Sequence, residues 1–123
     1  MVLVKDYKDL QIWQKADLLA HRVYLLTRSF PSEERFNLTS QLTRAALSVP
    51  TNIVEGFYRT PREFVHFIVI AVGSLKETEY LLDVAVLRQY VTQEQIAELK
   101  GVIEELSKMT SVFIKALTRS LVN

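Results

Sequence analysis

The chain has 123 residues and a mass of 14.2 kDa, and its 15 Lys/Arg and 14 Asp/Glu residues give a formal net charge of +1. A chain of this length forms one domain, which we expect to span residues 1–123, and a hydrophobic content of 49% excludes an intrinsically disordered protein. The absence of cysteine excludes disulfides, thiolate chemistry and cysteine-ligated zinc. Residues 1–62 carry nine basic and six acidic side chains, an asymmetry too small to identify a nucleic-acid-binding protein.

The N-terminal stretch MVLVKDYKDL is too short and too charged to be a secretory signal peptide. The most apolar stretch, residues 64–75, is well below the roughly 20 residues that a bilayer-spanning helix needs. We therefore expect a cytoplasmic protein without a membrane partner.

Apolar residues recur at helical spacing along the whole chain, and no segment alternates as a strand does. The first predicted helix covers about residues 9–29 and stops at Pro31. The second covers about residues 38–58, with Asn37 in the N-cap position.

The third predicted helix covers about residues 61–90 and begins with the capping box Thr60-Pro61-Arg62-Glu63. A second capping box, Thr92-Gln93-Glu94-Gln95, opens the last helix at about residues 93–121. Because the connections are short, the sequence favours an all-α, antiparallel, up-down-up-down four-helix bundle.

The third helix is apolar on nearly every side between residues 64 and 75, whereas a helix of a small bundle normally keeps one face in water. We therefore expect other copies of the chain to cover it. Gly56 and Gly73 are expected to allow close approach between helices. The candidate interface residues are Phe64, Phe67, Ile68, Ile70, Ala71, Gly73 and Ser74.

A polar stripe follows one side of the second helix, at separations of 3, 4, 4, 3 and 4 residues. Its members are Gln41, Arg44, Ser48, Asn52, Glu55 and Arg59. A solvated face is the simplest interpretation. However, Pro50 removes a backbone donor and frees the carbonyl of Ala46, which Ser48 and Asn52 are close enough in sequence to satisfy.

If the second and third helices fold back at Thr60, residues equidistant from the turn become neighbours. The expected neighbours are Glu55 with His66, Ser48 with Gly73 and Ser74, and Arg44 with Glu77. This register predicts an Arg44–Glu77 ion pair, within one chain or across a subunit boundary, so that His66 and Glu77 join the polar stripe. Structural registration is favoured over ligand binding.

Catalytic chemistry has little support in the sequence. Glu63 and His66 form a Glu-x-x-His unit of the kind found in di-iron bundles, but the second histidine, His21, has Leu18 in the position of the glutamate. No serine–histidine arrangement and no glycine-rich phosphate loop is present. We therefore expect no catalytic residue, cofactor, metal or small-molecule substrate, with a bundle-core metal enzyme as a remote alternative.

Trp13 and the five tyrosines are spread along the chain and are interpreted mainly as core or boundary residues rather than as stacking platforms for bases. Arg44, Arg59 and Arg62 are the basic residues nearest the stripe, and structural pairing is favoured over phosphate binding for them.

The run SQLTRAALSVPTNIVEGFYRTPREFVHFIVIAVGSLKETEYLL resembles the family of proteins encoded in intervening sequences of 23S rRNA genes, also called four helix bundle proteins. LQIWQKA and SFPSEERFNLTSQ are similar to it too, so the likeness covers almost the whole chain. Thr78, Val54 and Tyr58 depart from the family pattern. The matching residues are Gln41, Arg44, Ala45, Ser48, Pro50, Asn52, Glu55, Gly56, Arg59, Phe64, Phe67, Ala71, Gly73, Ser74, Glu77 and Glu79.

The resemblance implies an antiparallel four-helix fold that assembles as a homopentamer around a central opening, and it does not imply a catalysed reaction. The family is distantly similar to pentameric accessory proteins of diversity-generating retroelements, whose more basic surface engages nucleic acid and a reverse transcriptase. The charge of +1 departs from that basic character. We therefore expect a non-enzymatic oligomeric scaffold that binds RNA or an RNA-associated protein; the alternative is a protein–protein adaptor without nucleic-acid binding.

Overall fold

Four α-helices and two short 3-10 helices make up residues 4–122, the part of the chain that the computed structural model describes, and this part contains no strand. The all-α, four-helix expectation is therefore confirmed. The elements are η1 (Tyr7–Asp9), α1 (Gln11–Thr27), η2 (Ser32–Glu34), α2 (Leu38–Phe57), α3 (Pro61–Leu87) and α4 (Gln93–Val122).

Two helices are shorter than the sequence predicts. Leu10 is extended, with φ −78° and ψ 125°, and separates η1 from α1, so that α1 begins at Gln11 rather than near residue 9. At the end of α3, Gln89 has a φ of 65° and the N–H of Tyr90 donates to the carbonyl of Ala85. A left-handed residue of this kind ends a helix and is usually glycine, which explains why a glutamine gave no stop signal in the sequence.

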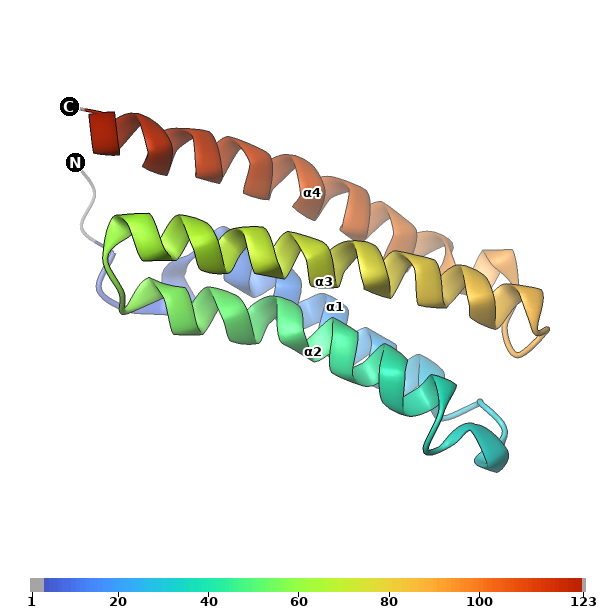
Figure 1. The fold of residues 1–123 in the computed structure, drawn as a ribbon. Coiled ribbons are helices and arrows are strands. Elements are labelled where there is room, and N and C mark those ends of the chain that lie inside the picture. Colours follow the sequence, from blue (N-terminus) through green and yellow to red (C-terminus); the bar gives the residue numbers. More distant parts are fainter. Residues whose placement is uncertain (1–3, 123) are drawn as a thin grey trace.

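The helices lie lengthwise beside one another, and α2 packs most extensively against α3 (Figure 1). α2 also contacts α1, and α4 contacts both α1 and α3. Within the described residues no Cα atom of α1 lies within 8 Å of a Cα atom of α3, so these two helices lie at diagonally opposite corners of the fold. The turn between α2 and α3 lies at the same end as the start of α1 and the end of α4, and the other two connections lie at the opposite end (Figure 1).

The core is apolar and receives side chains from all four helices. Leu19, Leu42, Ile68 and Ile103 are among its fully buried members. Two threonines are also fully buried, and each donates its hydroxyl to a carbonyl of the preceding turn: Thr78 to Ser74 at 2.8 Å and Thr110 to Leu106 at 2.9 Å. A polar group inside the core therefore does not go unpaired at these two positions.

Both predicted capping boxes are confirmed. Thr60 and Glu63 exchange side-chain and backbone hydrogen bonds at the start of α3, and Thr92 and Gln95 do the same before α4. The N-cap expectation for Asn37 is wrong in one respect, because its side chain makes no capping hydrogen bond. The N–H of the first residue of α2 instead donates to Glu34 Oε1, at 3.2 Å.

Glu34 also links the α1–α2 connection to the α3–α4 connection, which lies at the same end of the fold. The hydroxyl of Tyr90, which follows α3, donates to Glu34 Oε2 at 2.6 Å, and the ring of Tyr90 lies 5.7 Å from that of Phe30. The Tyr90 hydroxyl and the Leu38 N–H lower the pKa of Glu34. The same carboxylate raises the pKa of Tyr90, because it accepts the phenolic hydrogen.

The variant Tyr90→Phe removes the hydroxyl and so tests the contribution of the Tyr90–Glu34 hydrogen bond to stability. The folded protein lowers the pKa of Glu34, so the interaction stabilises the fold above the carboxyl's unfolded pKa of about 4.3 and is lost as the pH falls through the folded value. We expect Tyr90→Phe to lower the free energy of unfolding at pH 7 and to leave it almost unchanged at about pH 3. Urea denaturation at both pH values, with Tyr24→Phe as the control, measures the effect; an equal loss at both would contradict it.

Candidate interaction surface

The surface that carries the polar stripe is built on a close contact between α2 and α3 beside their connecting turn. A Cβ atom added at Gly56 would lie 2.7 Å from Cβ of Phe67 and 2.8 Å from Cδ1 of Phe64, so only a hydrogen atom fits there. The expectation for Gly56 is confirmed. The same expectation for Gly73 is wrong within the chain, because that residue is exposed and an added Cβ would have no neighbour within 4 Å; a close approach to another copy stays a prediction.

A hydrogen bond between Ser48 and Ser74 fixes the register of the two helices further from the turn. The two Oγ atoms are 2.9 Å apart, with Ser74 donating, and the residues are 26 positions apart in the chain. Asn52 Nδ2 donates to the Ser48 carbonyl at 2.8 Å and lies 2.9 Å from the Ser48 Oγ. The predicted contact between Ser48 and Ser74 is therefore confirmed, and three half-buried polar side chains form one network.

Pro50 neither ends α2 nor draws polar side chains to the carbonyl that it leaves free. The helix continues through it to Phe57. Asn52 donates to Ser48 and Thr51 donates to Leu47, at 2.7 Å, so the expected side-chain partner of the Ala46 carbonyl is not found. Both bonds reach back four residues along the helix, whereas Ala46 lies six residues before Asn52, and this spacing explains the difference.

Charged residues cluster where the stripe reaches the turn. Arg59 Nη2 donates to Glu55 Oε1 at 2.5 Å, and Arg59 Nη1 lies 3.8 Å from Glu63 Oε2. The guanidinium carbon of Arg59 lies 5.3 Å from the ring centroid of Phe67, a cation–π distance. Hydrogen bonds from the Thr60 hydroxyl and N–H, with the nearby Arg59, lower the pKa of Glu63.

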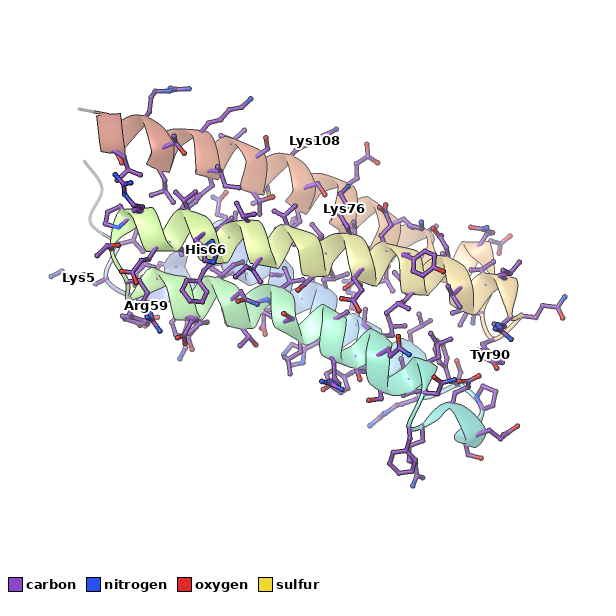
Figure 2. The ribbon with its side chains drawn as sticks, viewed as in Figure 1. Lys5, Arg59, His66, Lys76, Tyr90 and Lys108 are labelled. Atoms are coloured by element: carbon purple, nitrogen blue, oxygen red, sulfur yellow. The ribbon has the colours of Figure 1, made fainter. Side chains whose placement is uncertain are left out.

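The expected contact between Glu55 and His66 is not formed, because Glu55 pairs with Arg59, which lies in the turn directly after α2. His66 is exposed, and its ring lies edge-on to Phe67 at 6.0 Å (Figure 2). Arg44 and Glu77 are both exposed and form no ion pair within the described chain. The Arg44–Glu77 pair is thus wrong as an intrachain contact, while its form across a subunit boundary stays a prediction.

The first residue of the stripe, Gln41, is exposed and donates from Nε2 to Asn37 Oδ1 at 3.5 Å. It borders a hollow that Tyr80, Leu81 and Val84 of α3 also line, but no hydrogen bond joins it to α3 within the described chain. The stripe is therefore divided: its central residues Ser48 and Asn52 belong to the α2–α3 contact, and its two ends face outward.

The candidate interface residues separate into three groups. Phe64, Ile68 and Ala71 lie in the chain's own core, so the expectation that they face another copy is wrong. Phe67 and Ser74 are half-buried beside α2. Ile70 and Gly73 are exposed. Val69 is exposed too, although it was not among the predicted interface residues. We call the exposed residues His66, Val69, Ile70 and Gly73 the α3 strip.

Six aromatic rings form a chain of edge-on contacts at the end of the fold that carries the α2–α3 turn. The contacts run from Trp13 to Tyr7 (5.0 Å between centroids), to Tyr58 (6.4 Å), to Phe57 (4.9 Å), to Phe64 (6.1 Å) and to Phe113 (5.5 Å). We call these six residues the aromatic cluster. The rings come from η1 and all four helices, so no spacing in the sequence indicated that they would meet.

Residues 4–122 contain no arrangement of side chains suited to metal binding and no helix suited to crossing a membrane. The two histidines lie on different helices, His21 beside Asp17 at 3.2 Å and His66 in the α3 strip. No group of three or more potential metal ligands occurs among the described side chains. None of the described helices combines the length and hydropathy of a bilayer-spanning segment.

The comparison with known proteins agrees with this helical architecture. Residues 8–112 match the family model of the 23S rRNA-intervening sequence protein. The chain belongs to this family. The match takes in all of α1, α2 and α3, and the first two thirds of α4.

A protein of known structure has a similar fold. It is a protein of unknown function from the S23 ribosomal protein family of Bacteroides thetaiotaomicron, with a TM-score of 0.75 and 25% sequence identity. The alignment covers 85% of the present chain and 98% of that chain. No curated protein is significantly similar to the chain.

In this family member, the importance of the α2–α3 contact is tested by adding a single methyl group at Gly56. The methyl group of Gly56→Ala would push Phe64 and Phe67 away from α2, and overpacking of this kind costs about 1–3 kcal/mol of stability. Gly101→Ala is the matched control, because Gly101 is a helical glycine with no neighbour within 4 Å of an added Cβ. It should stabilise the protein by about 0.5–1 kcal/mol. Denaturant unfolding measures both, and equal effects would contradict the close contact.

Proposed function

We propose that the chain is a non-enzymatic helical scaffold of the cytoplasm: an up-down-up-down antiparallel bundle that assembles with its own copies into a ring-shaped homopentamer. The observation that carries the proposal is the α3 strip. Val69 is 52% exposed and Ile70 is 39% exposed in the middle of the longest apolar stretch of the chain. A partner that covers them removes this apolar surface from water.

A second apolar surface at the opposite corner of the fold supports a ring rather than a two-fold dimer. Leu18 and Leu25 are seven residues apart on α1, so they lie on one side of that helix, and they are 40% and 62% exposed. No Cα atom of α1 lies within 8 Å of one in α3 within the described chain, so the two helices are diagonal to each other. Two different surfaces on opposite sides of a subunit suit head-to-tail contacts, which close into a ring when the rotation allows.

The double substitution Val69→Lys/Ile70→Lys tests the assembly. Two charges on the α3 strip would have to be buried without partners, so we expect the complex to dissociate to the 14.2 kDa chain in light scattering after size exclusion. Val112→Lys, at an apolar α4 residue that is 68% exposed, should leave the assembly intact. A wild-type protein that is monomeric at micromolar concentration would refute the proposal.

The same measurement tests the proposed Arg44–Glu77 pair across the subunit boundary. Arg44→Glu places two carboxylates together and should weaken the assembly, whereas the charge swap Arg44→Glu/Glu77→Arg should restore it. Equal behaviour of the single and double variants would remove the pair from the interface.

We propose further that the scaffold binds RNA or an RNA-associated protein. The family is described by its relation to 23S rRNA-intervening sequences, and the solved relative by a ribosomal protein family. Lys5, Lys8 and Arg62 make no ion pair with a described carboxylate and are available for phosphate. Five copies of a chain of charge +1 carry about +5, and repeated weak contacts add through avidity.

RNA binding of this origin depends steeply on salt. We expect the wild-type assembly to bind labelled RNA in about 50 mM salt and to lose much of its affinity in about 200 mM salt, because phosphate contacts release counterions. Fluorescence anisotropy measures this. Failure to bind at low salt, together with a protein partner that co-purifies, would favour the adaptor instead.

A further inference from the structure

The aromatic cluster presents one ring to solvent. Tyr58 follows the last residue of α2 and is 66% exposed, although the rings of Tyr7 and Phe57 support it at 6.4 Å and 4.9 Å. An aromatic ring that its neighbours hold in place and that water reaches is a platform on which a flat group can stack.

Cations flank both rings at the outer end of this cluster. Lys5 and Lys8 lie two residues before and one after Tyr7, and the Lys8 ammonium lies 5.9 Å from the Tyr7 ring centroid. Arg59 and Arg62 lie one and four residues after Tyr58. The contact between the two tyrosines therefore brings basic residues of both segments to one end of the fold, and Figure 2 shows Lys5 and Arg59 there together.

The carboxylates of this end are mostly engaged. Asp6 accepts the N–H of Lys8 at 2.9 Å, while Glu55 and Glu63 are both paired with Arg59. Asp9 lines a separate, largely apolar hollow of about 520 Å³ against α4. The four carboxylates equal the four cations of these segments in number, but Lys5, Lys8 and Arg62 form no ion pair with a described carboxylate, so their charged groups are free to contact a phosphate.

We infer that this end of each subunit is a binding site for single-stranded nucleic acid, in which Tyr58 stacks on an unpaired base and Lys5, Lys8 and Arg62 contact the adjoining phosphates. The inference rests on the RNA-binding role proposed above and names its site. A single strand is favoured over a duplex because stacking on a protein ring requires a base that is not already stacked. It is favoured over an acidic peptide because a peptide would use the cations and leave the exposed ring without a matching flat group.

Tyr58→Ala removes the platform, and Tyr80→Ala is a closely matched control because Tyr80 is also 66% exposed but lies on α3. We expect Tyr58→Ala to weaken binding of a fluorescein-labelled oligouridine of about 12 nucleotides by about tenfold in anisotropy at low salt. Tyr58→Phe keeps the ring and should keep the affinity, and Tyr80→Ala should bind as the wild type does. Circular dichroism and size exclusion verify that each variant folds and assembles.

A cation variant tests the phosphate contacts independently. Lys8→Gln/Arg62→Gln should reduce the slope of log affinity against log salt by about 1.4, the value for two phosphate contacts on a single strand. Arg28→Gln/Arg35→Gln, in the connection between α1 and α2 at the opposite end, should leave the slope unchanged.

The possible outcomes distinguish an error in the Tyr58 binding site from an error in the proposed RNA-binding role. If the wild type binds the oligouridine and Tyr58→Ala binds it equally well, the site is wrong while the RNA-binding role stands. If the wild type does not bind at low salt, both fail. A loss of affinity in Tyr58→Ala that Tyr58→Phe does not share supports the stacking site; a Tyr58-dependent contact with a polypeptide but not with RNA overturns it.

Discussion

The close approach of α2 and α3 at Gly56 is the constraint on which the rest of the structure depends. Because only a hydrogen atom fits between that backbone and Phe67, the two helices meet at the turn, and Ser48 and Ser74 meet further along. This register divides the polar residues of α2. Ser48 and Asn52 enter the contact, while Arg44 and Glu55 remain exposed. A bulkier residue at position 56 would change the packing and the surface together.

The same contact decides which part of α3 is available to another molecule. With α2 on one side and the core below, Phe64, Ile68 and Ala71 are enclosed, and between residues 64 and 75 the large apolar side chains that remain exposed are Val69 and Ile70 of the α3 strip. The end of the fold beside the turn has a different character, since the aromatic cluster and several unpaired cations lie there. The proposed self-association rests on the first of these features, and the proposed nucleic-acid site rests on the second.

Much of this architecture could be predicted from local patterns. Helical spacing and two capping boxes located four helices, and the turn at Thr60 placed Ser48 against Ser74. The pairing of Arg44 with Glu77 failed within the chain because the register specifies neighbouring turns but not which way a long side chain extends. Glu55 pairs with Arg59, four residues later in the turn after α2, rather than with a residue of α3. The end of α3 at Gln89 had no signal, since a glutamine adopts the left-handed conformation there.

The sequence by itself determined the all-α class, the number of helices and the family, because spacing, caps and family motifs are properties of neighbouring residues. Only the tertiary structure decided which apolar residues of α3 are buried and which are exposed, since a helix that is apolar on every side contains no record of which side its neighbours cover. The aromatic cluster also depends on the tertiary structure, because its rings come from segments between Tyr7 and Phe113. Contacts between distant segments depend on how the helices pack, and no local pattern records that.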